Sequence, residues 1–365
     1  MKSTSGAHYI ALDHVRALAA FIVFTWHFLH SVNGYPVPFS QAPVIFPLAL
    51  LDEGHTGVAL FMVLSGYLFS KLLSNKKIDY KKFLWNRGLR LLPLLLFVIF
   101  IRFFVIAYTG TSSDEIKNYL LSIAEGLIAP SLPNGGWSIT VEFHFYLILP
   151  LLLILLSKSK TAMGGILVAA VALRWLIYEN RGEVQNLAYF TIVGRIDQFL
   201  LGMLAYRFGN SMRGRHFSMA MTSALFFAFY WKFDALGGFM RSPSYPSTNP
   251  IWVVMGTIEG LFFALFISWY DTSFKHSTGF ASSMLAKVGE YSYSIYLLHM
   301  FFVFSAARFI HEKIMDISNF YTALAWALVC FGLMLPIAGA SYRLIEIPFM
   351  KWRQPYIRVE NIKIY

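Results

Sequence analysis

The sequence predicts an all-α integral membrane protein, a bundle of about ten transmembrane helices with both termini in the cytoplasm. Of its 365 residues, 57% are hydrophobic and 18% are aromatic, whereas only 13% are charged. This composition is typical of a chain that lies in a bilayer. Ten apolar stretches are long enough to cross it. They cover residues 11–30, 55–73, 90–108, 139–157, 162–178, 188–206, 216–233, 250–270, 288–310 and 320–345.

We expect a single membrane domain over residues 1–365, without an appended soluble domain, because the loops between spans reach only about 30 residues. The first span is as long as a membrane crossing, and no small-residue cleavage pattern follows it. We therefore expect it to remain as the first helix rather than to be removed as a signal peptide. Cys330 is the only cysteine, which excludes an internal disulfide and a cysteine-rich metal site.

The basic residues indicate the orientation in the membrane. With the N-terminus in the cytoplasm, 20 of the 30 Lys and Arg residues fall in cytoplasmic segments and six in external loops. The remaining four lie within the spans: Arg16, Arg102, Arg174 and Arg195. Because positive charge is enriched in cytoplasmic loops, both termini should be cytoplasmic. The same distribution explains the net charge of +11 without a nucleic-acid partner.

Among the ionisable residues of the first span, Arg16 and His27 are eleven positions apart. On a helix they lie on one face, about 16 Å apart along the axis. Ionisable groups within a bilayer usually face a protein interior and mark a functional pathway. Each has a structural alternative: Asp13 could pair with Arg16, and His27 could lie at the headgroups. Because Arg16 and His27 share one face, we favour a functional role over these structural explanations. We expect His27 to act as a proton acceptor, with His30 as the reserve candidate for the same role.

The third span begins at two arginines, Arg87 and Arg90, which are spaced i, i+3 with two residues between them. Such a pair can hold phosphate oxygens through bidentate hydrogen bonds. Cytoplasmic loops contain similar pairs without any ligand, and for these residues taken alone we favour that explanation.

Two further stretches combine polar side chains with a predicted span. In residues 135–150, Trp137 and Ser138 precede Glu142, and we expect Ser138 to be the N-cap of the helix. In residues 290–300, Tyr296 and His299 belong to a polar stripe that should face the bundle interior, where His299 could also be a purely structural histidine.

The span at 188–206 contains Arg195, which needs a partner if it is buried, and then Gly202, which indicates close helix packing. No serine has the G-x-S-x-G setting, no histidine has the H-x-x-x-D spacing, and H-E-x-x-H and glycine-rich phosphate motifs are absent. The sequence therefore supports neither an acyl-serine nor a zinc mechanism, and we expect no metal.

Taken together, these pieces resemble the membrane-bound acyltransferase family 3, in the family's order and through nearly the whole chain. The matching segments are Leu12-Asp13 with Arg16-x10-His27, GHTGVALFMVLSGYLF at 54–69, Arg87-x-x-Arg90, GGWSITVEFHFYLILP at 135–150, RIDQFLLG at 195–202, YSYSIYLLH at 291–299, and the closing residues 342–348.

The resemblance implies a ten-span enzyme of the bacterial cytoplasmic (inner) membrane. Such an enzyme takes an acyl group, commonly acetyl, from cytoplasmic acyl-CoA. It transfers the group to a hydroxyl of an extracytoplasmic glycan, such as lipopolysaccharide O-antigen, exopolysaccharide or another lipid-linked sugar. The family implies an essential role for Arg16 and His27 and a donor-binding role for Arg87 and Arg90. Glu142 matches an acidic position of the family motif.

We therefore expect direct transfer, with an acyl-histidine intermediate as an open alternative. Arg87 and Arg90 would bind the CoA phosphates, His27 would act as general base, and Arg16 would hold the donor or steady the histidine's surroundings. Glu142 would complete the catalytic set. The expected substrate-binding residues are Trp137, Ser138, Tyr296, His299 and Arg195. The expected partners are acyl-CoA, the glycan or lipid-linked sugar and the membrane lipids.

The competing function is a proton- or anion-coupled transporter. In that case the intramembrane residues Arg16, His27, Glu142 and Arg195 would form the ion path, and these residues alone do not separate the two functions. Inverted repeats with broken helices would favour transport, and none is visible in the sequence.

Overall fold

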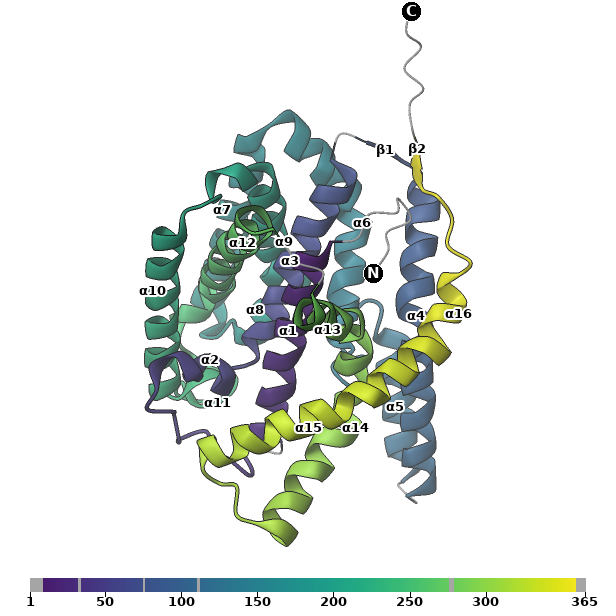
Figure 1. Cartoon of the computed structure of the whole chain (residues 1–365), viewed down its shortest axis with the longest axis vertical. Helices are drawn as coiled ribbons and strands as arrows, with labels where there is room; N and C mark the ends of the chain where they lie inside the picture. The colour runs from purple at the N-terminus through teal and green to yellow at the C-terminus, as the bar shows by residue number, and fades with distance from the viewer. Residues whose placement is uncertain (1–8, 32–33, 75, 110–111, 276–278, 359–365) are drawn as a thin grey trace, which may run out of the picture.

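The computed structural model describes residues 9–31, 34–74, 76–109, 112–275 and 279–358, and its regular structure is almost entirely helical (Figure 1). The longer helices are α1 (Ile10–Leu29), α3 (Thr56–Leu73), α4 (Tyr80–Tyr108), α5 (Ser113–Glu125), α6 (Trp137–Lys158), α7 (Lys160–Arg181), α9 (Ile192–Arg207), α10 (His216–Ala235), α12 (Met255–Ser273), α13 (Phe280–Glu290), α14 (Ser292–Phe309) and α15 (Phe320–Ser341). The short ones are α2 (Ala49–Asp52), α8 (Gln185–Phe190), α11 (Gly238–Arg241) and α16 (Ile347–Met350). The predicted all-α class is confirmed.

Among the described residues, seven helical segments are long and apolar enough to cross a membrane. They are α1, α3, α4, α6, Thr161–Arg181 of α7, Ser292–Ile314 around α14, and Phe320–Met350 from α15 to α16. The other three predicted spans fall on α9, α10 and α12, which do not combine that length with that apolarity. The chain is thus an integral membrane protein by its helices. The total of ten spans and the cytoplasmic termini remain predictions.

Two predicted boundaries were wrong. The helix expected at 90 begins at Tyr80, where the Asp79 side chain accepts a hydrogen bond from the backbone N–H of Lys82 at 3.2 Å. Arg87 and Arg90 therefore lie within α4 rather than at its start. The span expected at 288–310 is broken at Tyr291, where α13 ends and α14 begins.

Helix α1 lies in the middle of the bundle and contacts α3, α13, α14 and α15 (Figure 1). Beside it, α3 and α9 cross so closely that the crossing requires glycine on both helices. A Cβ on Gly66 would lie 2.0 Å from the carbonyl oxygen of Phe199, and one on Gly202 would lie 2.0 Å from that of Val63. Small residues let membrane helices approach in this way, as expected for Gly202.

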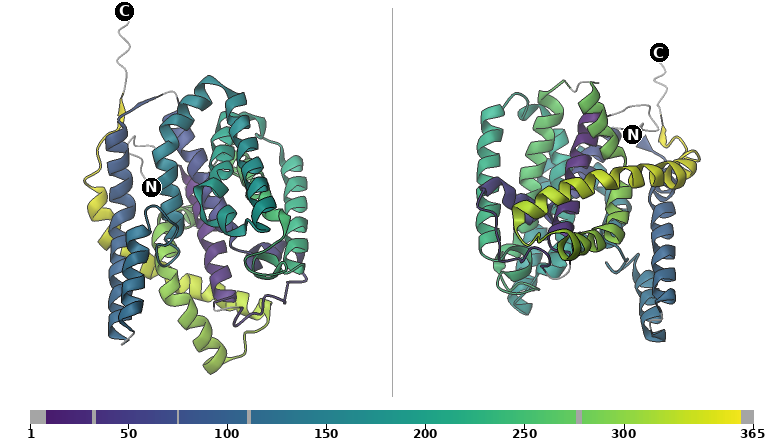
Figure 2. Two further views of the ribbon diagram at one scale, coloured as in Figure 1. Left: turned by 180° about the vertical axis from the view of Figure 1, so that it is seen from behind. Right: turned by 60° about the horizontal axis from the view of Figure 1, so that its bottom comes forward.

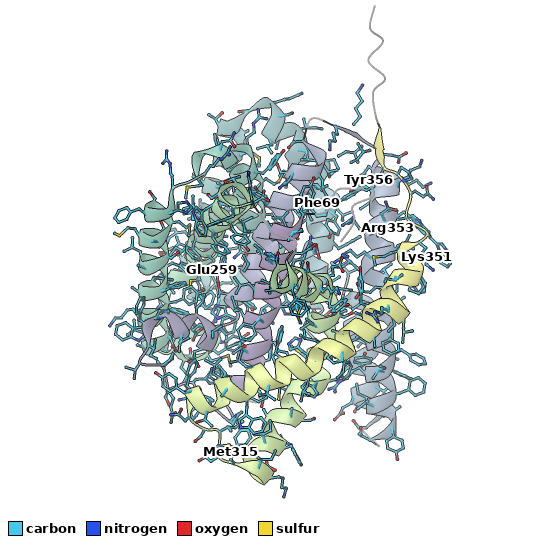
Figure 3. All side chains as sticks on the ribbon, viewed as in Figure 1. Phe69, Glu259, Met315, Lys351, Arg353 and Tyr356 are labelled. Atoms are coloured by element: carbon cyan, nitrogen blue, oxygen red, sulfur yellow. The ribbon has the colours of Figure 1, made fainter. Side chains whose placement is uncertain are left out.

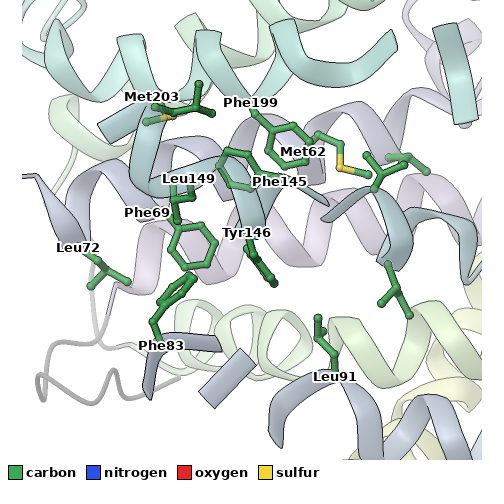
Figure 4. Close-up of a cluster of buried hydrophobic side chains, with 14 of the residues drawn as sticks. Met62, Phe69, Leu72, Phe83, Leu91, Phe145, Tyr146, Leu149, Phe199 and Met203 are labelled. Atoms are coloured by element: carbon green, nitrogen blue, oxygen red, sulfur yellow. The ribbon is translucent and has the colours of Figure 1, made fainter. Parts of the chain in front are cut away.

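An aromatic core joins α3, α4, α6 and α9 at one end of the bundle (Figure 4). The rings of Phe145 and Phe199 stack with centroids 4.0 Å apart, and Phe69 packs edge-on against Phe83 and Tyr146. Edge-to-face and offset ring pairs stabilise such contacts beyond their buried area, by about 0.5–1.5 kcal/mol each. These contacts hold α3, α4 and α6, which carry polar residues of the interior, in fixed positions relative to one another.

Helix α4 packs against α6 on one side and carries α5 folded back along it (Figure 2). The hydroxyl of Tyr119 on α5 donates to the carbonyl of Ile99 on α4 at 2.8 Å. At the other end of the chain, α15 continues through a π-helical turn (Tyr342–Glu346) into α16. The following segment, which carries Arg353 and Tyr356, then runs beside α4 (Figure 3). Its two-residue strand β2 (Ile357–Arg358) pairs antiparallel with β1 (Lys77–Ile78).

Candidate active site

A cavity of about 110 Å³ lies between α1, α3, α4, α6 and α14. It brings together most of the residues that the sequence singled out from separate spans. Arg16, Arg87, Arg90, Ser138, Glu142 and Tyr296 all line it. Three arginines and a carboxylate in one apolar-walled cavity are a strong indication of a ligand site.

The arginines gather on the side formed by α1 and α4. Arg16 forms an ion pair with Asp13, so the predicted structural alternative is present, and its guanidinium nevertheless lines the cavity. The Arg87 guanidinium lies over the rings of Phe69 and Phe83, at 5.3 and 5.6 Å from their centroids. Its Nε is buried and has no hydrogen-bond partner among the described residues. An unpaired buried charged donor is costly, which favours an anionic ligand here.

Glu142 lies on the α6 wall of the same cavity and is held by two hydroxyl groups. Ser65 Oγ donates to Glu142 Oε1 at 3.3 Å, and the Tyr146 hydroxyl donates to the same oxygen. Two donors on one carboxylate oxygen fix the orientation of the Glu142 side chain. Tyr146 is the i, i+4 neighbour of Glu142 and lies on the same face of α6. Ser65 was missed, and the only signal for it is its place in the segment 54–69.

His27 meets His299 across the interface of α1 and α14, with their nearest ring nitrogens 3.2 Å apart. His299 Nδ1 lies 2.6 Å from the carbonyl oxygen of Tyr296 and 3.1 Å from that of Ile295. Because carbonyl oxygens only accept, Nδ1 carries the hydrogen and His299 Nε2 is an acceptor.

The donor to His299 is then His27 Nδ1–H, which is also 2.9 Å from the carbonyl oxygen of Val23. These two contacts assign the His27 hydrogen to Nδ1 and leave the lone pair on Nε2. Within the described part of the chain, no protein group forms a hydrogen bond with His27 Nε2. A half-buried neutral imidazole of this tautomer can accept a proton from a substrate hydroxyl.

Tyr296 connects the cavity to the histidine pair. It lines the cavity, its hydroxyl donates to the carbonyl of Gly135 at 3.1 Å, and its ring centroid is 6.0 Å from that of His299. On α14, Tyr296 and His299 are one turn apart. The polar stripe predicted for this helix therefore faces the interior, as expected.

A second cavity, of about 580 Å³, lies between α4, α5 and α14. His27 is not among the lining residues of either cavity. Its lining combines polar and apolar side chains: Arg102, Ile106, Glu115, Asn118, Tyr119, Pro133, Asn134, Met300, Phe301 and Phe304. The Phe304 ring centroid is 6.3 Å from that of His27. The polar members were not predicted as site residues, because none of them belongs to a recognisable motif.

The remaining expected residues have structural contacts. Ser138 is not the N-cap: α6 begins at Trp137 after Gly136, and Ser138 Oγ donates to the carbonyl of Gly135 at 3.1 Å. Trp137 packs against Tyr189, with centroids 5.0 Å apart. Its ring also lies beneath the guanidinium of Arg195 at 5.7 Å.

Arg195 is 1% exposed and lies behind that tryptophan rather than on the cavity wall. Its Nε donates to the carbonyl of Tyr189 at 2.7 Å and its Nη1 to Gln198 Oε1 at 3.0 Å, with Glu259 at 3.9 Å. The partner that a buried arginine needs is therefore present. The substrate-binding role of Arg195 remains a prediction.

His30, the reserve candidate, follows the end of α1 and has partners on both ring nitrogens. These are the carbonyl of Val37 at 2.8 Å and Asp52 Oδ1 at 3.2 Å. Burial lowers the pKa of His30, but the hydrogen bond and charge of Asp52 outweigh it, so the pKa is raised overall. A histidine paired on both sides is a poorer general base than His27.

Fold and cavity together define a polytopic membrane protein whose interior holds a cavity lined by arginines and a carboxylate, with a pair of histidines near it. Comparison with known families specifies the class further. The acyltransferase domain of family 3 matches residues 9–343, so the chain belongs to this family. The resemblance seen in the sequence is confirmed.

Curated relatives carry names of the same kind. A Staphylococcus aureus (strain MRSA252) protein named "Putative O-acetyltransferase" is 23% identical over 368 residues, covering 84% of this chain and 56% of its own length. The peptidoglycan O-acetyltransferase OatA of Listeria monocytogenes is 24% identical over 396 residues, covering 93% of this chain and 56% of its own length. The chain thus spans about half the length of these relatives. No solved structure gives a significant match.

Proposed function

We propose that the protein is a membrane O-acyltransferase that moves an acyl group, acetyl by analogy with its relatives, from acyl-CoA to a glycan hydroxyl outside the cytoplasm. The observation that carries this proposal is the free Nε2 lone pair of His27, together with the contacts that join His27 through His299 and Tyr296 to the cavity lined by Arg16, Arg87 and Arg90. The arginines suit the phosphates of the donor, and the imidazole suits proton transfer from the acceptor.

The proposed chemistry needs one base and no covalent enzyme intermediate. His27 Nε2 takes the proton of the acceptor hydroxyl as that oxygen forms a bond to the thioester carbonyl carbon. The carbon–sulfur bond then breaks, and the CoA sulfur takes up the proton, leaving an ester and neutral His27. His299 keeps His27 in the required tautomer, because it accepts the Nδ1–H. Arg16 has further N–H donors beyond the one given to Asp13 and can hold the donor in the cavity.

The acceptor class is a second part of the proposal. The 580 Å³ cavity is linked to His27 by Phe304, which lines the cavity and whose ring centroid is 6.3 Å from that of His27. It has amide, carboxylate and guanidinium groups among aromatic rings, a combination that can hydrogen-bond sugar hydroxyls and pack on sugar rings. The Listeria relative is named for peptidoglycan, and we propose a cell-envelope glycan as the acceptor here. The location in a bacterial cytoplasmic membrane belongs to the same proposal.

The test is a transfer assay with the full chain purified in detergent, acetyl-CoA as donor and isolated cell-envelope glycan as acceptor. We expect release of CoA together with a mass increase of roughly 42 Da on the glycan, which indicates an acetyl ester. The transporter alternative makes a different prediction. Ion flux into sealed vesicles that needs no acyl-CoA, with no ester formed in the assay, would favour transport and reject acyl transfer.

A further inference from the structure

The C-terminal strap, residues 351–358, is bound to α4 at several points. Asn86 on α4 donates from Nδ2 to the carbonyl of Gln354 at 2.7 Å, and its Oδ1 accepts from the Gln354 N–H at 2.9 Å. The backbone N–H of Asp79 donates to the carbonyl of Tyr356 at 2.8 Å. The pairing of β1 with β2 continues this contact.

The strap is also packed as part of the core. Tyr356 is 2% exposed and its ring lies edge-on to Phe83, with centroids 5.6 Å apart. Asn86 is fully buried, and both polar ends of its side chain are paired with the backbone of Gln354. Burying the side-chain amide of Asn86 costs free energy unless its hydrogen bonds are made. Because the Gln354 backbone makes them, the strap is favoured in the one position that keeps these bonds.

This attachment brings Arg353 next to the arginines of α4. Asn86 precedes Arg87 in the chain, and Gln354 follows Arg353. The hydrogen bonds between Asn86 and Gln354 therefore bring the backbone at Arg353 close to the backbone at Arg87. Figure 3 shows Arg353 on the segment that runs beside α4. Burial and the positive charges of Arg90 and Arg87 lower the pKa of Arg353, although a guanidinium remains charged.

Placing the guanidinium groups of Arg87, Arg90 and Arg353 close together in a half-buried region costs free energy, because like charges repel, unless a negative charge is nearby. Glu346, at the end of the π-helical turn, is close enough to Arg90 to interact with it electrostatically. The Arg353 Nε donates to the carbonyl of Met350 at 3.1 Å, which leaves its remaining N–H groups as donors for a ligand. The buried, unpartnered Nε of Arg87 lies in the same region. An anion with several charged oxygens would satisfy these groups together.

We propose that Arg353 is a third phosphate-binding residue of the donor site, and that the C-terminal strap is the element that places it there. The proposal rests on the proposed function, because the anion is the phosphate-bearing end of acyl-CoA. Arg87 and Arg90 line the cavity, whereas Arg353 is not among its lining residues. It would bind the phosphates at the entrance, while the acyl-bearing arm lies inside.

The first measurement is CoA binding to the full chain purified in detergent, by calorimetry. A charge-assisted hydrogen bond is worth about 1.5–3 kcal/mol, so Arg353→Gln should weaken CoA binding by roughly 10- to 150-fold. Lys351→Gln is the matched control, because it removes an exposed positive charge two residues away on the same strap. We expect the control to bind CoA like the wild type. Equal affinities for the Arg353 variant and the control would overturn the proposal.

A second measurement separates phosphate binding from a general effect on the strap. Acetyl-pantetheine carries the thioester but no phosphate, so Arg353→Gln should use it at the wild-type rate. Arg353→Lys, which keeps the charge, should recover part of the CoA affinity. An equal loss with acetyl-CoA and acetyl-pantetheine would assign Arg353 a structural role and reject phosphate binding.

These outcomes also separate the two proposals. If the wild type does not bind CoA, the donor of the proposed function is wrong, and the role of Arg353 is rejected with it. If the wild type binds CoA and the double variant Arg87→Ala/Arg90→Ala does not, while Arg353→Gln binds normally, only the role of the strap is wrong.

Discussion

Replacing His27 with glutamine tests whether its Nε2 removes the acceptor proton. Glutamine keeps a polar side chain of similar reach but has no basic nitrogen. Loss of a general base typically slows the step by 10²- to 10⁴-fold, so transfer should fall by at least about 100-fold. Acyl-CoA binding should be unchanged, because the arginines that we assign to the donor are on α1 and α4.

The structure also predicts that replacing His299 should slow acyl transfer less than replacing His27 does. His27 Nδ1–H has two acceptors, His299 Nε2 at 3.2 Å and the Val23 carbonyl at 2.9 Å. His299→Phe removes one of them and leaves the shorter contact in place. One neutral hydrogen bond contributes about 0.5–1.5 kcal/mol, which corresponds to a rate loss of roughly 2- to 12-fold.

The assay is ester formation from acetyl-CoA on the purified full chain, with CoA affinity measured in parallel. The two variants should differ by at least about tenfold in transfer rate. Near-normal transfer by His27→Gln would rule out the base. A loss for His299→Phe as large as that for His27→Gln would show that the two histidines exchange the proton as a unit, contrary to the assignment of tautomers.

Three further perturbations follow from the geometry. Arg87→Ala/Arg90→Ala should reduce CoA affinity by at least about 100-fold while the protein elutes normally in size-exclusion chromatography, since each lost charge-assisted bond costs about 1.5–3 kcal/mol. Gly202→Ala should lower the thermal unfolding midpoint, because the added Cβ meets the backbone of α3 at 2.0 Å and overpacking costs about 1–3 kcal/mol; Gly332→Ala, with nothing within 4 Å, should not. Burial and then a neighbouring carboxylate raise the pKa of Glu53 to about 8. Because this folded-state pKa exceeds the unfolded value, stability falls as pH rises from about 4.5 through 8, and Glu53→Gln should flatten the difference in midpoint between pH 5.5 and 8.5. An unchanged pH dependence in Glu53→Gln would contradict the assignment.

The sequence alone determined the class of the protein and the contents of single helices. Apolar stretches predict membrane helices because a bilayer forces the backbone to satisfy its own hydrogen bonds. The helical period then places Arg16 and His27 on one face of α1, and Glu142 and Tyr146 on one face of α6, before any packing is known. The motif segments were sufficient to indicate the family.

Local signals were weaker at helix ends. Ser138 has the side chain of an N-cap, yet Gly136 occupies that position. Arg87 and Arg90 were placed at a helix start, whereas α4 begins ten residues before the predicted boundary. Hydropathy detects only the apolar part of a helix. Where a helix continues into polar residues at the membrane surface, its true end lies outside the stretch that hydropathy predicts.

Only the tertiary structure decided which helices meet. The partner of His27 is His299, 272 residues further along the chain, and one of the two donors to Glu142 is Ser65 on α3. The attachment of Arg353 beside α4 depends on a buried asparagine that carries no motif. These contacts are set by packing register between helices and by close crossings such as that at Gly202, and hydropathy and helical period do not encode register between segments far apart in sequence.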